Sequence, residues 1–154
     1  MLLGMFVATV AAGLFSGAAV YITFVEHPAR LECGQVPAVT EFGPSYRRAA
    51  VMQASLVFVG MLAGVVAWSR GFGTGWLVGG LLLGSLIPFT LFVMMPTNLR
   101  LLDAGLDRGS AEAGRLLVRW GRFHALRMVV GLAVFVAFVV MMLRRLDAGL
   151  KGAG

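Results

Sequence analysis

Four long apolar runs constrain this chain more than any other feature of its sequence. The runs without a charged residue are residues 2–25, 49–69, 71–99 and the shorter 128–143. A helix needs about 20 mostly apolar residues to cross the hydrocarbon of a bilayer. Three runs meet that length, and the fourth meets it if residues 123–127 join it with Arg127 facing the protein interior.

The sequence therefore predicts an all-α membrane protein, a four-transmembrane-helix antiparallel bundle that forms a single domain over residues 1–154. The expected spans are residues 2–27, 46–69, 75–99 and 120–143. A content of 59% hydrophobic and 13% charged residues argues against a soluble domain. The first run lacks the basic start and the short apolar core of a secretory signal, so we expect it to be a mature span.

Turn residues indicate how the spans are connected. The glycine-rich segment at residues 70–75 is short, which predicts an antiparallel hairpin of spans two and three. Spans one and three both continue through a proline, in the similar segments around Pro28 and Pro96. This similarity raises the alternative of two repeated hairpins. Ser110 precedes Glu112 in the pattern of a helix N-cap, so the last helix is expected to run from Ala111 to Leu143.

Basic residues are distributed unevenly between the two sides of this bundle. Nine arginines lie in or beside the connections after spans one and three, whereas four basic residues lie on the other side. Because such an excess marks cytoplasmic loops, both termini are predicted to be non-cytoplasmic. The use of 12 arginines against one lysine suggests a GC-rich bacterial genome, hence the bacterial inner membrane. The net charge of +6 is then explained by topology and lipid headgroups, without a nucleic-acid partner.

Helical phase separates polar residues that face the interior from those that face solvent. In the last span Trp120, His124 and Arg127 share one face, opposite the Arg119 side. In the second span Gln53 lies on a stripe of small residues that suits close helix packing. The predicted polar cavity near the cytoplasmic membrane face contains Glu26, His27, Tyr46, Gln53, Asn98, Trp120, His124 and Arg127. As alternatives, the two aromatics could be interfacial anchors and the histidines could bond to helix-end carbonyls.

Several motifs in this order resemble a known family. They are Glu26-His27-Pro28-Ala29-Arg30-Leu31, Pro44-Ser45-Tyr46-Arg47-Arg48, Met52-Gln53-Ala54-Ser55, Met95-Pro96-Thr97-Asn98, and Trp120-Gly121 followed by His124 and Arg127. The chain resembles the bacterial branch of a four-helix integral membrane family of unknown function that includes the anthrone oxygenases. The resemblance implies the four-span fold. The family pattern often has glutamine where this chain has His27, which implies that His27 is not an obligatory ligand.

Two functions of different kinds fit these residues. One is a non-catalytic membrane protein whose cavity binds a small amphiphile or a partner. The alternative is a cofactor-free, anthrone-oxygenase-like enzyme that oxidises a lipophilic phenolic or anthrone substrate, entering from the bilayer, with O2. In the second, His124 is the base, and Arg127 and Tyr46 stabilise the developing enolate. The expected substrate-binding residues are Gln53, Asn98, Trp120, His27 and Glu26.

No cofactor and no metal are expected. The single cysteine, Cys33, offers no disulfide within the chain, and no His, Cys or carboxylate spacing suits a metal ion. A haem held by His27 and His124 and a transport function are minor alternatives. The expected partners are a lipophilic aromatic small molecule and the lipid bilayer, and the oligomeric state stays open.

Overall fold

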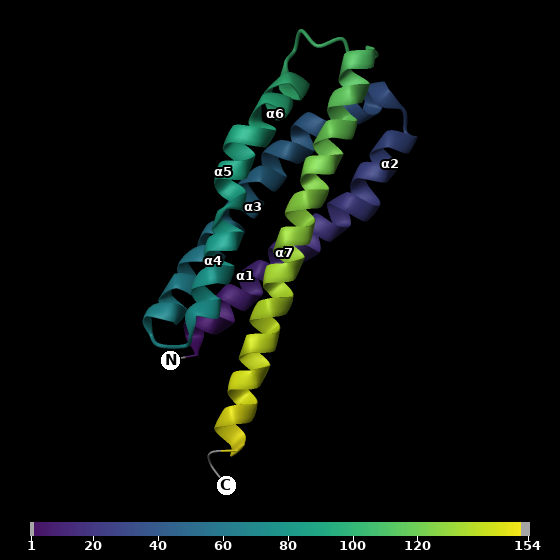
Figure 1. The fold of residues 1–154 in the computed structure, drawn as a ribbon. Coiled ribbons are helices and arrows are strands. Elements are labelled where there is room, and N and C mark those ends of the chain that lie inside the picture. The colour runs from purple at the N-terminus through teal and green to yellow at the C-terminus, as the bar shows by residue number, and fades with distance from the viewer. Residues whose placement is uncertain (1, 152–154) are drawn as a thin grey trace.

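The computed structural model describes residues 2–151, which form four long helical rods (Figure 1). The first rod consists of α1 (Leu3–Tyr21), η1 (Ile22–Glu26) and α2 (His27–Glu32), and the second is α3 (Gln35–Ser69). The third consists of α4 (Thr74–Gly84), α5 (Leu86–Phe89), η2 (Thr90–Met94) and α6 (Met95–Leu102), and the fourth is α7 (Ala111–Lys151). All four are long and apolar enough to cross a membrane. The prediction of an all-α, four-span membrane protein is therefore confirmed.

The rods pack so that sequence neighbours run antiparallel. α1 packs along α3 and α7, and α4 packs along the same two helices, which places α1 and α4 on a diagonal of the bundle. Both chain ends lie at one end of the bundle, and the α2–α3 and α6–α7 connections lie at the other (Figure 1). We call these the termini end and the loop end.

Small residues bring helices into backbone contact at the termini end. A Cβ added to Gly64 of α3 would lie 2.8 Å from the carbonyl oxygen of Trp76 and 3.1 Å from the Cα of Gly80, both in α4. Beside this contact, Trp76 and Phe138 are buried and stack with ring centroids 4.7 Å apart. The predicted hairpin of spans two and three therefore has a close-packed interface.

α3 begins at Gln35, well before the residue 46 expected from the apolar run. Pro44 lies inside the helix and lacks an N–H to donate, which ordinarily weakens a helix. The preceding turns are nevertheless helical because Ala38, Val39 and Phe42 are buried in an apolar cluster at the loop end. Burial of one face outweighs the weak local propensity of this segment.

α7 begins where its cap predicts. The Ser110 hydroxyl accepts the backbone N–H of Ala113 at 3.2 Å, and Glu112 lies in the first turn. The helix continues past Leu143 to Lys151, through the polar residues that follow the apolar run. At about 1.5 Å per residue, such a helix is roughly 60 Å long and extends beyond a bilayer core at its ends.

The two odd rods share a five-residue π-helical turn. In η1 the backbone N–H of His27 donates to the carbonyl of Ile22, and in η2 that of Met95 donates to the carbonyl of Thr90. Each π turn directly precedes a residue followed by proline, Pro28 or Pro96. The local similarity read from the sequence thus corresponds to a shared backbone feature. Such turns re-aim side chains and are frequent at functional sites.

Candidate functional site

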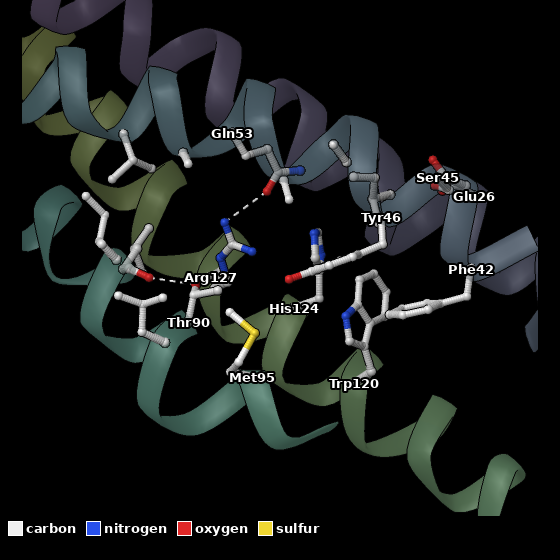
Figure 2. Close-up of a pocket in the computed structure, with 18 of the residues that line it drawn as sticks. Glu26, Phe42, Ser45, Tyr46, Gln53, Thr90, Met95, Trp120, His124 and Arg127 are labelled. Carbon is white, nitrogen blue, oxygen red and sulfur yellow. Dashed lines mark hydrogen bonds between the residues drawn. The ribbon is translucent and has the colours of Figure 1, made fainter. Parts of the chain in front are cut away.

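A pocket of about 190 Å³ lies among all four rods toward the loop end (Figure 2). Its walls come from η1 and α2, from α3, from α5, η2 and α6, and from α7. Gln53 and Tyr46 project from α3 toward Arg127 and His124 of α7, with Met95 facing them from α6 (Figure 2). The lining residues are Ile22, Glu26, Arg30, Phe42, Ser45, Tyr46, Ala49, Ala50, Gln53, Ala54, Val57, Leu86, Ile87, Thr90, Leu91, Met95, Trp120, His124 and Arg127.

Arg127 brings a cation into this pocket without a carboxylate beside it. Its Nη2 donates to Oε1 of Gln53 at 3.0 Å, and its guanidinium lies 5.5 Å from the centroid of the Phe15 ring. Its Nε is buried and has no hydrogen-bond partner. Among residues 2–151, the ion pairs involve other arginines and Lys151. A cation paired only with neutral groups in apolar surroundings attracts an anionic or polar ligand.

His124 is buried and held by two neighbours. Its Nδ1 lies 3.2 Å from the Thr23 hydroxyl, which comes from the π turn of η1. Its ring stacks on Trp120 with centroids 4.9 Å apart. These contacts fix the orientation of the imidazole and leave Nε2 as the nitrogen available to a ligand in the pocket.

Tyr46 is oriented by a residue behind the pocket wall. The amide Nδ2 of Asn98 donates to the Tyr46 hydroxyl at 3.2 Å, and Asn98 is fully buried. The Tyr46 ring stacks on Phe42 at 5.5 Å, and Phe42 meets the edge of Trp120 at 5.4 Å. Three aromatic rings therefore bound the pocket at its loop end.

Arg30, which belongs to the first motif but was not among the predicted site residues, lies in the site. It is 7% exposed, and it pairs with the carboxylates of Glu26 and Glu41. Ser45 donates to Glu26 at 2.7 Å and accepts from Arg30 at 3.2 Å. The spacing of Glu26 and Arg30, one helical turn apart in the first motif, was the available signal for this network.

His27 is buried outside the pocket. Its ring centroid lies 5.2 Å from that of Trp120, and its imidazole covers the backbone of Gly121, where any Cβ would collide with it. Of the two histidines that the haem alternative invokes, only His124 lines the pocket. His27 packs between the first rod and α7.

The structure thus brings most of the predicted polar residues together and separates two of them. Those that line the pocket are Glu26, Tyr46, Gln53, Trp120, His124 and Arg127, whereas His27 and Asn98 lie behind its walls. Their chemical roles stay predictions. Thr23, Arg30, Ser45 and Thr90 were not among the predicted site residues. Arg30 and Ser45 belong to the motifs given above, but one sequence does not show that their side chains reach the site. Within the described residues, no group of three or more His, Cys, Asp or Glu side chains could hold a metal ion.

This arrangement is suited to proton removal from a weakly acidic apolar molecule. An oriented imidazole lies within a pocket whose walls are mainly aliphatic and aromatic, and a guanidinium and a phenol share the space. Away from water, a fixed cation and a hydroxyl donor stabilise a developing oxyanion far more than they would in solution.

Comparison with known proteins identifies the family. A family model described as anthrone oxygenase matches residues 42–137, which contain Tyr46, Gln53, His124 and Arg127. The searches of curated proteins and of solved structures found no match. The matched segment spans more than half of the chain and includes three of the four walls of the pocket. The chain therefore belongs to the anthrone oxygenase family.

Proposed function

We propose that this protein is a cofactor-free oxygenase that converts a lipophilic anthrone or related phenolic compound into a quinone with O2. The observation that carries the proposal is the guanidinium of Arg127, which has no carboxylate partner and shares an apolar pocket with His124. The family match supports the same class of chemistry.

The first step is the removal of a proton. The carbon of an anthrone that lies between two aromatic rings is acidic, because the carbanion formed there is an enolate delocalised onto the ketone oxygen. Nε2 of His124 takes the proton. Arg127 and the Tyr46 hydroxyl stabilise the negative oxygen. Trp120 and Phe42 line the pocket, so a flat aromatic substrate would contact their rings.

O2 then reacts with the carbon that has lost the proton. The enolate passes one electron to O2, and the two radicals combine to form a carbon–oxygen bond and a peroxide anion. The imidazolium of His124 returns its proton to the peroxide. Loss of the remaining proton from that carbon, with cleavage of the O–O bond, gives the second carbonyl and releases water. One substrate and one O2 thus yield one quinone and one water, with no other reductant.

The test uses the purified protein in phosphatidylcholine vesicles with 1,8-dihydroxyanthrone, and records oxygen uptake and quinone absorbance. Arg127→Met and His124→Gln are each expected to lower the protein-dependent rate about 10² to 10³-fold. Arg119→Ala, on the solvent-facing side of α7, is the control and should retain the rate. A wild-type rate equal to that of protein-free vesicles overturns the proposal. Binding without turnover would instead support the non-catalytic amphiphile-binding function.

The proposal extends to the placement of the pocket in a bacterial inner membrane. The excess of arginine near the loop end supports a cytoplasmic loop end and non-cytoplasmic termini. In a Cys33→Ser background, Lys151→Cys should react with a membrane-impermeant maleimide from outside intact cells, and Arg108→Cys should not. Labelling of position 108 from outside overturns this orientation.

A further inference from the structure

We infer that the pocket opens sideways into the lipid between α3 and η2, and that it admits its ligand in the uncharged state. The inference takes the identity of the ligand from the proposed function, but the opening itself follows from packing. It specifies the substrate class: a flat, neutral molecule without a phosphate, carboxylate or carrier group.

The lining residues that are exposed rather than half-buried are apolar. Among the lining residues, Ala54 of α3 and Leu91 of η2 are exposed, and Ala50 and Ile87 beside them are partly buried. All four belong to segments that cross the membrane by length and composition. The rim of the pocket on this side therefore faces hydrocarbon and not water.

The loop end of the pocket is covered. Phe42 and Trp120 pack edge to face, and the Arg30 guanidinium lies 5.9 Å and 5.7 Å from their ring centroids. Figure 2 shows Phe42, Tyr46 and Trp120 grouped at this end of the pocket. The bond from Ser45 to Glu26 ties α3 to η1 beside them. A ligand approaching from the aqueous side would have to separate these contacts.

The opening has a structural cause in the packing of α3 against the third rod. At the termini end, α3 and α4 touch through Gly64 and Gly80. Closer to the loop end, α3 makes few contacts with the rest of the third rod, which consists of α5, η2 and α6. The small side chains of Ala50 and Ala54 do not bridge the separation, and the π turn aims Thr90 inward while Phe92, 80% exposed, points outward.

The apolar rim of the pocket favours the entry of uncharged molecules over that of ions. Moving an ion from water into hydrocarbon is costly, so a neutral molecule passes the apolar rim far more readily. The same molecule meets His124 and Arg127 only inside the pocket. Ionisation thus follows entry, and the enolate, once formed, is retained by the guanidinium and by the apolar rim.

The test measures entry with a product-like probe that does not react. Vesicles containing the protein receive 1,8-dihydroxyanthraquinone, and stopped-flow quenching of tryptophan fluorescence is recorded. The quenching phase that is absent in Trp120→Phe is the one caused by probe in the pocket. Ala54→Phe should slow this phase at least tenfold. Val51→Phe, on an exposed face of α3 one turn earlier, is the matched control and should leave it unchanged. Leu91→Ala should not slow it.

A second probe tests the preference for uncharged molecules separately from the route of entry. Anthraquinone-2-sulfonate, which carries a fixed charge, should quench Trp120 at least tenfold more slowly than the neutral probe. Equal rates for the two probes, an unaltered rate in Ala54→Phe, or no access of the neutral probe to Trp120 overturns the inference. If Ala54→Phe slows entry of the probe but the wild type takes up no oxygen, the proposed oxidation is wrong and the lateral opening stands. If Ala54→Phe leaves turnover unaffected, the lateral opening is wrong and the proposed oxidation stands.

Discussion

The two ends of the bundle differ in the size of the side chains that lie between the helices. At the termini end, glycines let α3 and α4 approach until backbone meets backbone, and Trp76 and Phe138 fill the remaining space. At the loop end, aromatic and polar side chains hold the rods apart around a pocket. Close packing stabilises helices in lipid, where no hydrophobic force drives them together. The comparison indicates that glycines bring α3 and α4 into contact at the termini end, whereas larger side chains leave room for a pocket toward the loop end.

The loop end carries a thermodynamic cost that the termini end does not. Trp120 Nε1 and Arg127 Nε are buried without hydrogen-bond partners. Each such group costs about 1–3 kcal/mol relative to a satisfied one. Under the proposed function, a ligand in the pocket binds the folded protein only, so adding it is expected to raise Tm.

The largest effect that would test this comparison is the loss of close packing at Gly64. In Gly64→Val the new Cβ lies 2.8 Å from the carbonyl oxygen of Trp76, a backbone atom that cannot move alone. We expect a loss of about 3 kcal/mol in the free energy of unfolding, seen as a lower Tm in detergent. Gly17→Ala, where a Cβ meets nothing within 4 Å, is the control. Equal Tm values for the two variants would show that the glycine contact is not a source of stability.

A somewhat smaller effect is expected at the buried ion pair of the loop end. Arg30→Met leaves the carboxylates of Glu26 and Glu41 without their cation. Because both carboxylates are partly exposed, we expect a loss of about 2 kcal/mol rather than the larger cost of a fully buried pair. The double variant Arg30→Met with Glu26→Gln should recover part of the lost Tm. If the double variant is less stable than Arg30→Met, Arg30 acts through packing and not through its charge.

The sequence predicts the fold better than the site, for physical reasons. Apolar length fixes the number of spans, and alternating direction fixes the antiparallel order, so the four-helix bundle needs no tertiary information. The early start of α3 does depend on tertiary burial of Phe42, which overrides Pro44. Helical phase correctly grouped Gln53, His124 and Arg127, because each lies on a regular helix.

Phase separates neighbours on one helix but does not reveal partners that are distant in sequence. Glu26 and His27 are adjacent, so phase alone points them about 100° apart, and the structure places Glu26 on the pocket and His27 behind its wall. The bond between Thr23 and His124 joins two rods, and one sequence cannot reveal such a pair. The burial of Arg30 was not predicted, because charge patterns report the side of the membrane and not burial.

Thr23 provides a smaller test, confined to the chemistry of the loop end. Thr23→Val keeps the shape of the side chain and removes the hydroxyl that lies 3.2 Å from Nδ1 of His124. Under the proposed function, kcat should fall about tenfold, since one neutral hydrogen bond that orients the base is lost. KM should be unchanged, the pH dependence of kcat should shift, and Thr23→Ser should restore both. A change in Tm with an unaltered pH profile would assign Thr23 to packing alone.

The smallest effect is expected at Asp103, in the connection between α6 and α7 outside the spans. The backbone N–H of Gly105, at 2.8 Å, and the guanidinium of Arg100 lower the pKa of the Asp103 carboxyl below its ordinary value. A carboxyl with a lowered pKa stabilises the fold above the pKa of the unfolded chain, about 4, and this contribution is lost as the pH falls through the folded pKa. Because Asp103 is exposed, water and salt screen it, and Asp103→Asn should lower Tm at pH 7 by about 1 °C or less. The difference from wild type should shrink as the pH falls below about 4 and through the folded pKa, when Tm is measured in detergent across this range. A decrease as large as that of Gly64→Val would mean that the polar loop end, and not the glycine contact, limits the stability of the bundle.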